Sequence, residues 1–229
     1  MKVKVLTIFP EMFPGFLGIS LTGKALDEGK WSLEAVNIRD YAFDKHGSVD
    51  DTPSGGGAGM VMRADVLGAA LKANYTGGRL INMSPRGVPL TQAKVRELAR
   101  EENLTIVCSR FEGIDERVLE AYNAEDISIG DYILTGGEQA AQIMLDAVIR
   151  LLPGVLGNAE SAVSESFESD LLEYPQYTRP TVWEGREIPE ILLSGHHKKI
   201  NDWRHLQSEE ITKRRRPDLW KKYLASKEI

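Results

Sequence analysis

The sequence has little cysteine and no long apolar run. Cys108 is the only cysteine among 229 residues, so an internal disulfide is excluded and a reduced compartment is expected. No apolar stretch approaches the roughly 20 residues that a membrane-crossing helix needs. The first residues include Lys2 and Lys4 and turn polar too early for a secretory signal. We therefore expect a cytoplasmic protein that makes no use of a membrane.

The chain also lacks the net positive charge of a simple nucleic-acid binder. Its formal charge is −6, but the first 170 residues carry −9 and residues 171–229 carry +3. Within residues 196–227, ten Lys and Arg stand against four Asp and Glu, with Trp203, Trp220 and Tyr223 interspersed. Such a segment can neutralise phosphates and stack on bases. It can equally be a solvated helix whose aromatic side chains turn inward.

No phosphate-binding motif is present. A nucleotide-dependent metabolic enzyme on a doubly wound sheet would carry a glycine loop directly after its first strand, where this chain has Phe9 and Pro10. The glycine-rich stretch at residues 55–59 lacks both the Lys-Ser/Thr ending of a P-loop and the G-x-G-x-x-G spacing. It lies in a region without periodicity, residues 39–63, and a loop this long is usually functional or mobile.

What is present is an alternation of strand-like and helix-like segments. Short apolar stretches predict strands at residues 3–8, 32–38, 79–83, 104–108 and 127–129. Periodic stretches predict helices at residues 11–28, 64–74, 91–102, 116–122, 138–152 and 196–213, with a short last helix after Pro217. Residues 84–89 are predicted to form a rigid turn. This order predicts an α/β fold with a mostly parallel sheet and helices on both faces.

Composition also predicts the domain boundaries. Serine and glycine dominate after Pro153, which indicates a flexible linker at residues 158–170. We expect a large domain at residues 1–157 before this linker and a small helical domain at residues 171–229 after it.

Two of the predicted strands end in loops that mix glycine with carboxylates. The strand at residues 105–108 is followed by Glu112 and Gly113, and the strand at residues 127–129 is followed by Gly130, Asp131, Gly136 and Gly137. Glycines with positive φ would let the backbone approach a flat ligand, although ordinary turns also favour glycine. Because open α/β sheets bind ligands beyond the carboxyl ends of their strands, these loops predict a pocket.

The same region resembles a known family. The matching motifs are RFEGIDERV at residues 110–118, SIGDYILTGGE at 128–138, VDDTP at 49–53, GGGAGM at 55–60, SPRG at 84–87 and YTRP at 177–180. Together they resemble the bacterial tRNA (guanine-N1-)-methyltransferase family of the SPOUT superfamily. The resemblance implies transfer of a methyl group from S-adenosyl-L-methionine to ring N1 of the guanosine just 3′ of the anticodon, a modification that helps to maintain the reading frame.

The resemblance assigns catalytic roles to an arginine and a carboxylate. Arg150 would stabilise negative charge that develops on the guanine. Glu165, which stands before Ser166 where the family usually has aspartate, would remove the N1 proton. Asp170 is the reserve candidate for that base. A non-catalytic RNA-binding relative would have lost one of these groups, whereas Arg150 and Glu165 are both present.

The resemblance also assigns the residues that would bind the cofactor. They are Met83, Ser84, Pro85, Arg86, Ser109, Glu112, Ile129, Gly130, Asp131, Tyr132, Ile133, Leu134, Gly136 and Gly137. The chain departs from the family at three positions: Ser109 replaces a usual glycine, Phe111 a usual tyrosine and Arg86 a frequent glutamine. Ser109 would crowd the ligand if its φ were positive, or its hydroxyl could donate a hydrogen bond. Glu112 could contact the positively charged methionyl end or cap the next helix.

The remaining implications concern RNA, topology and assembly. Residues expected to contact tRNA are Gly55, Gly56, Gly57, Gly59, Met60, Arg179, Lys198, Lys199, Arg214 and Arg215. Members of this superfamily tuck the cofactor loops into a deep trefoil knot and act as homodimers, with the active site between the knotted domain of one subunit and the linker and C-terminal domain of the other. No metal site is predicted.

Overall fold

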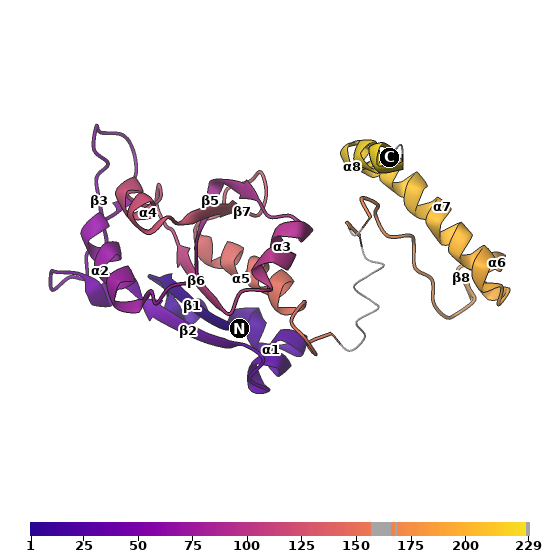
Figure 1. The fold of residues 1–229 in the computed structure, drawn as a ribbon, viewed down its shortest axis with the longest axis horizontal. Coiled ribbons are helices and arrows are strands. Elements are labelled where there is room, and N and C mark those ends of the chain that lie inside the picture. The colour runs from indigo at the N-terminus through magenta and orange to yellow at the C-terminus, as the bar shows by residue number, and fades with distance from the viewer. Residues whose placement is uncertain (157–165, 168, 228–229) are drawn as a thin grey trace. The chain divides into compact units, whose positions relative to one another are not determined.

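The computed structural model describes residues 1–156, 166–167 and 169–227. The chain divides into two compact units, Met1–Gly157 and Asn158–Ile229 (Figure 1). The first unit is built on a sheet, and the second consists mainly of helices.

Five parallel strands form the sheet of the first unit, in the order β2-β1-β6-β5-β7. Their bounds are β1 Lys2–Thr7, β2 Ser32–Asn37, β5 Arg79–Pro89, β6 Asn103–Cys108 and β7 Glu125–Ser128. Parallel neighbours need crossover connections, and the alternation of strands and helices along the chain supplies them. The predicted α/β class and parallel sheet are confirmed.

Helices cover both faces of this sheet. On one face lie α1 (Ser20–Asp27), α3 (Gln92–Leu98) and α5 (Gly137–Ile149), and on the other lie α2 (Ala64–Asn74) and α4 (Glu116–Tyr122). Strand β6 shows why: Leu104, Ile106 and Cys108 pack in the first cluster, whereas Val107 packs in the second. Because successive side chains of a strand point to opposite faces, side chains of one strand pack in both halves of the core.

The prediction of a single helix at residues 11–28 is wrong. Two 3-10 turns, η1 (Pro10–Met12) and η2 (Gly15–Gly18), precede α1. Gly15 has a φ of +56°, a left-handed conformation that a regular helix cannot contain. A Cβ on Gly23 would lie 2.3 Å from the carbonyl oxygen of Gly18, so the first turn of α1 packs directly against η2.

The rigid turn predicted at residues 84–89 is instead the second half of β5. This strand pairs with β7 on both sides of a register shift between Met83 and Val88. A Cβ on Gly87 would lie 2.4 Å from the backbone of Asp126 and Ile127, so glycine permits the close approach of the two strands. The register shift falls in the part of β5 that borders a cavity.

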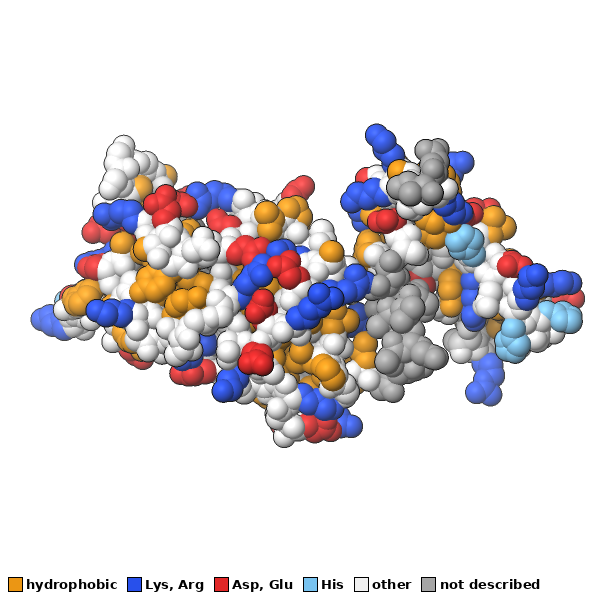
Figure 2. All heavy atoms as spheres, viewed as in Figure 1, with side chains coloured by type: hydrophobic (Ala, Val, Ile, Leu, Met, Phe, Trp, Pro, Cys, Tyr) orange, Lys and Arg blue, Asp and Glu red, His pale blue; other side chains and the backbone are white. Residues whose placement is uncertain are grey.

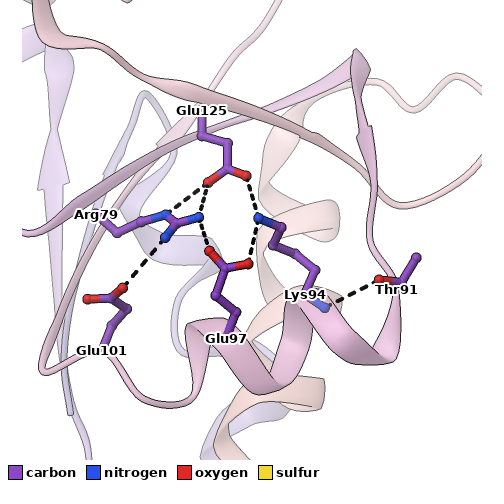
Figure 3. Close-up of polar contacts among 6 residues, drawn as sticks. All are labelled: Arg79, Thr91, Lys94, Glu97, Glu101 and Glu125. Atoms are coloured by element: carbon purple, nitrogen blue, oxygen red, sulfur yellow. Dashed lines mark hydrogen bonds and ion pairs between the residues drawn. The ribbon is translucent and has the colours of Figure 1, made fainter.

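A charged network joins the amino ends of β5 and β7 to α3. Arg79 donates to Glu125 through Nε at 2.9 Å and Nη2 at 2.7 Å and also pairs with Glu97. The Lys94 ammonium lies 2.8 Å from Glu97 and 2.9 Å from Glu125. Figure 3 shows the two cations between the carboxylates, with Glu101 at the rim. The network therefore ties three elements together at the amino ends of the strands.

The second unit contains α6 (Glu190–Leu193), α7 (His197–Arg215) and α8 (Pro217–Lys227), with a short hairpin of β8 (Val182–Trp183) and β9 (Arg186–Glu187). The two predicted C-terminal helices are thus present. The Thr212 hydroxyl of α7 accepts a hydrogen bond from the Leu172 backbone N–H at 2.8 Å, which attaches the preceding segment to the helix. In the described part of the chain, no helix is both long and apolar enough to cross a bilayer.

Candidate functional site

A cavity of about 230 Å³ opens at the carboxyl ends of β6 and β7, beside the middle of β5. The structure brings all the residues predicted to bind the cofactor except Asp131 into its wall: Met83, Ser84, Pro85, Arg86, Ser109, Glu112, Ile129, Gly130, Tyr132, Ile133, Leu134, Gly136 and Gly137. Asp131 is exposed and does not line the cavity. Three segments far apart in sequence therefore meet at one point.

Sequence reasoning missed seven residues of this wall. They are Asn82, Phe111, Ile114, Ile127, Ser128, Thr135 and Ala140, whereas Gly113 belongs to the loops from which the pocket was predicted. All but Ala140 lie within two residues of a residue predicted to bind the cofactor, so the rule that ligands lie beyond parallel strand ends could have found them. Ala140 needed the tertiary structure, because only the packing of α5 brings it to the cavity.

The glycines of the wall serve two different purposes. Gly113 and Gly130 have φ of +120° and +150°, as expected of residues that need glycine for their backbone. Gly136, with a φ of 177°, is extended, and Gly137 also lacks a positive φ, so the expectation for these two is wrong. A Cβ on Gly137 would lie 2.9 Å from the Cα of Cys108. The close packing of the chain against β6 explains this glycine.

Ser109 and Cys108 link the cavity to the core. The Ser109 hydroxyl donates to the Met83 carbonyl oxygen at 2.9 Å, joining the end of β6 to the middle of β5, and Ser109 does not have a positive φ. The expected crowding at this position is therefore absent. Burial raises the pKa of the Cys108 thiol well above its ordinary value, and the nearby Glu138 carboxylate raises it further. Cys108 is consequently a neutral core residue.

Glu112 connects the cavity to the glycine-rich loop. Its backbone N–H donates to the Met60 carbonyl oxygen at 2.9 Å. A Cβ on Gly59 would lie 2.5 Å from the Glu112 Oε1, so the carboxylate rests on this glycine. Met62 continues the contact through its N–H, which donates to the Gly113 carbonyl oxygen at 2.9 Å.

The glycine-rich loop is the end of a small hairpin. Strands β3 (Asp50–Asp51) and β4 (Val61–Met62) pair antiparallel at its base. The glycines at positions 55, 56, 57 and 59 all have positive φ. Because other residues rarely adopt this conformation, the glycines set the shape of the loop beside Glu112.

Arg86 makes a contact that sequence reasoning did not foresee. Its Nη2 donates to Glu116 at 3.0 Å. Glu116 is the first residue of α4, so the pair joins β5 to that helix at the mouth of the cavity. The Arg86 side chain remains 63% exposed.

The predicted catalytic residues fall in different parts of the chain. Arg150 directly follows α5 and is half-buried. Asp170 belongs to the second unit and has a φ of +57°. Glu165 lies outside the described residues. The structure therefore places Arg150 next to the helix that borders the cavity and sets no distance between it and either carboxylate.

The basic residues expected to contact tRNA are exposed on the second unit. They are Arg179, Lys198, Lys199, Arg214 and Arg215. Figure 2 shows Lys and Arg side chains at several points over the helices of this unit. Tyr223 is buried, and its hydroxyl donates to Glu209 at 2.6 Å. Tyr223 therefore fits the prediction of a helix whose aromatic side chains turn inward, and the exposed cations lie on the surface of the unit.

Together, these features define an α/β protein that has a ligand cavity at the carboxyl ends of its parallel strands and a separate, basic helical unit. A sequence model of the family described as tRNA (Guanine-1)-methyltransferase TrmD matches residues 1–222. The tRNA (guanine-N(1)-)-methyltransferase of Bartonella tribocorum is 64% identical over 222 residues, which are 97% of this chain and 96% of that protein. The same enzyme of Rhodospirillum rubrum is 60% identical over 99% of this chain and 95% of its own length.

The chain belongs to the tRNA (guanine-N1)-methyltransferase family. It is an enzyme that methylates guanine in tRNA at ring N1, and the resemblance seen in the sequence is confirmed.

Proposed function

We propose that the cavity binds S-adenosyl-L-methionine and that the enzyme methylates the guanosine just 3′ of the anticodon. The observation that carries the proposal is the convergence of three separate segments, assigned to the cofactor by resemblance, in the wall of one cavity. When bound, S-adenosyl-L-methionine supplies an electrophilic methyl group on a sulfonium centre.

The chemistry of the wall fits this cofactor. Met83, Ile127 and Leu134 offer apolar surface for an adenine ring. Glu112 offers a carboxylate for the cationic sulfonium or amino group. The backbone near Gly130, whose φ of +150° suits glycine, lies in the wall of the cavity and can approach the polar edge of the base. The cavity therefore has surfaces for both the flat and the charged halves of the ligand.

In the catalytic proposal, one residue stabilises the charge that develops on the guanine and another removes its N1 proton. Arg150 stabilises negative charge on the guanine, a role suited to a side chain that stays protonated and has several donors. Glu165 removes the N1 proton, with Asp170 as the reserve base. Arg150 and Asp170 belong to different units of the chain.

The RNA proposal divides recognition between two surfaces. Exposed cations on α7 and the segments before it contact phosphates of the anticodon arm and position it. The loop with Gly55, Gly56, Gly57 and Gly59 lies beside Glu112 and reads the target base. Since tRNA is the substrate, we place the reaction in the cytoplasm.

The resemblance to SPOUT proteins supports two further parts of the proposal. We propose that the loops around β5, β6 and β7 and the chain leading to α5 form a deep trefoil knot. We also propose a homodimer whose active site combines the cavity of one subunit with the linker and second unit of the other, which would let Glu165 act across the interface.

Methyl transfer tests the proposal directly. Labelled S-adenosyl-L-methionine is offered with two unmodified tRNAs that differ only in having guanine or adenine after the anticodon. We expect label in the guanine substrate alone. Equal labelling of both tRNAs would refute the proposed target. The absence of cofactor binding in an equilibrium titration would refute the assignment of the cavity.

A further inference from the structure

Arg110 and Glu138 form a buried ion pair that takes no part in the chemistry proposed above. Arg110 Nε lies 2.8 Å from Glu138 Oε2, and the side chains are 15% and 0% exposed. In the part of the chain that the structure describes, neither of these two atoms makes a hydrogen bond, so the contact between them is an ion pair. Each charge therefore depends on the other. Neither residue lines the cavity.

Three further contacts hold the pair in place. Arg110 Nη1 donates to the Thr135 carbonyl oxygen at 3.1 Å, and the guanidinium carbon lies 4.5 Å from the centroid of the Phe9 ring. The other oxygen of the Glu138 carboxylate, Oε1, accepts a hydrogen bond from the buried Thr7 hydroxyl at 2.7 Å. The pair thus joins the carboxyl ends of β1 and β6 to the first turn of α5 and to Thr135.

Thr135 belongs to a segment that we call the cofactor loop, residues 129–136. Most of this loop lines the cavity, but its apolar side chains contribute little anchoring, since Tyr132 is 54% and Ile133 80% exposed. The loop is anchored instead near its end, where Arg110 binds Thr135. Its position relative to the sheet therefore depends on the placement of the guanidinium.

Gly136 provides the space for that guanidinium. A Cβ at this position would lie 2.2 Å from Arg110 Nε, and the two cannot coexist. Because the φ of Gly136 is 177°, its backbone could be adopted by any residue. The packing of Arg110 therefore explains why glycine stands here.

Energetics favour a role in geometry over one in stability. Removing two charges from water costs about as much as their attraction returns, so a buried pair contributes little net stability. A guanidinium, however, directs its donors along fixed lines, and here one donor reaches the Thr135 carbonyl oxygen while Nε lies beside Glu138. The pair specifies where the cofactor loop meets the sheet.

We propose that Arg110 and Glu138 are positioning residues that hold the cofactor loop in the shape that binds the methyl donor. This inference rests on the proposed binding of S-adenosyl-L-methionine in the cavity. Losing one charge leaves the other buried and unpaired, so the guanidinium must leave its place and release Thr135. The affinity for the cofactor then falls, whereas the affinity for tRNA, whose proposed contacts lie elsewhere, does not.

The test compares three variants of the full chain with wild type. Glu138→Gln removes one charge but keeps an acceptor for Thr7. The double variant Arg110→Met/Glu138→Gln removes both charges, so no unpaired ion is buried. Arg79→Met, at the amino end of β5, breaks an ion network remote from the cavity and serves as the control. Equilibrium titrations give Kd for S-adenosyl-L-methionine and for tRNA, thermal unfolding gives Tm, and steady-state kinetics give KM for each substrate.

We expect both Glu138 variants to raise Kd and KM for the cofactor about tenfold, the scale of one lost charged hydrogen bond, with unchanged Kd for tRNA. The double variant should recover most of the Tm lost by Glu138→Gln but not its cofactor affinity. Arg79→Met should lower Tm alone. Wild-type cofactor affinity in the double variant, or equal losses of cofactor and tRNA affinity, would overturn the inference. If wild type binds tRNA but no cofactor, the assignment of the cavity fails, and the inference fails with it.

Discussion

Replacing Arg79 with methionine should lower the stability of the first unit without altering how it binds ligands. Arg79 and Glu125 are the first residues of β5 and β7, whereas the cavity begins at Asn82 and lies towards the other ends of these strands. Methionine keeps much of the side-chain length but removes both bonds to Glu125 and the pairing with Glu97. Lys94 remains as the one cation among the carboxylates.

The magnitude follows from burial. The side chains of Arg79 and Glu125 are 28% and 25% exposed, and hydrogen bonds between charged groups contribute about 1.5–3 kcal/mol. The contact with Glu97, which is 44% exposed, is screened by solvent and adds little. We therefore expect a loss of about 2 kcal/mol. For a chain of this size, that loss lowers Tm by about 4–8 °C.

The effect should depend on pH in a definite direction. Burial opposes ionisation of Glu125, but hydrogen bonds from Lys94 and Arg79 prevail and lower its pKa. Hydrogen bonds from Lys94 and Arg79 also lower the pKa of Glu97. A carboxylate whose pKa is lower in the folded state makes its full contribution to stability when the pH is above its pKa in the unfolded chain, which is 4.5 here. This contribution is lost as the pH falls through the folded-state pKa. The Tm difference between wild type and variant should shrink in acid.

Thermal unfolding at neutral and acidic pH is the assay, with Arg117→Met as the matched control. Arg117 pairs with Asp115 at 2.7 Å, but its side chain is 79% exposed, so its loss should cost no more than about 1 kcal/mol. Equal Tm losses for the two variants, or a difference for Arg79→Met that persists unchanged in acid, would refute the reasoning.

Four further outcomes test the site. Arg150→Ala should lower turnover about a hundredfold or more with nearly unchanged cofactor Kd, and normal turnover would remove Arg150 from catalysis. Glu165→Gln should bind both substrates in titrations but transfer no methyl group, and an active variant would assign the base elsewhere. Gly59→Ala should weaken cofactor binding because its Cβ displaces Glu112. Gly56→Ala, with open space around its Cβ, should leave cofactor binding unchanged. Equal effects of the two substitutions would contradict the role given to the contact between Gly59 and Glu112. Affinity for tRNA should fall steeply with salt, and a salt-independent Kd would argue against phosphate contacts.

Local patterns predicted most of the elements but not how they join. Alternation in β6, with Leu104 and Ile106 on one face and Val107 on the other, is a property of neighbouring residues, so it can be seen in the sequence. The helix predicted at residues 11–28 is broken at Gly15, whose φ is +56°, and Gly23 packs against Gly18 beyond the break; helical periodicity registers neither. The continuation of β5 beyond Met83 depends on pairing with β7, a strand distant in sequence.

The cofactor-binding residues were predicted by motif rather than by geometry. Ser109 shows the difference: its departure from glycine was visible, but its hydrogen bond to Met83 required the end of β5 to lie beside it. Gly136 shows the same difference between motif and geometry. Its φ is ordinary, and the reason for glycine at this position is the guanidinium of Arg110 beside it.

The sequence by itself determined most of the strands and helices, the parallel sheet, the family and most of the residues that gather at the strand ends, because periodicity and short motifs express these properties locally. Only the tertiary structure decided which side chains meet. The pairing of Arg110 with Glu138, and of Glu138 with Thr7, joins positions 28 and 131 residues apart. Such contacts arise when separate strands and a helix are packed into one core, and no local pattern records which partners that packing brings together.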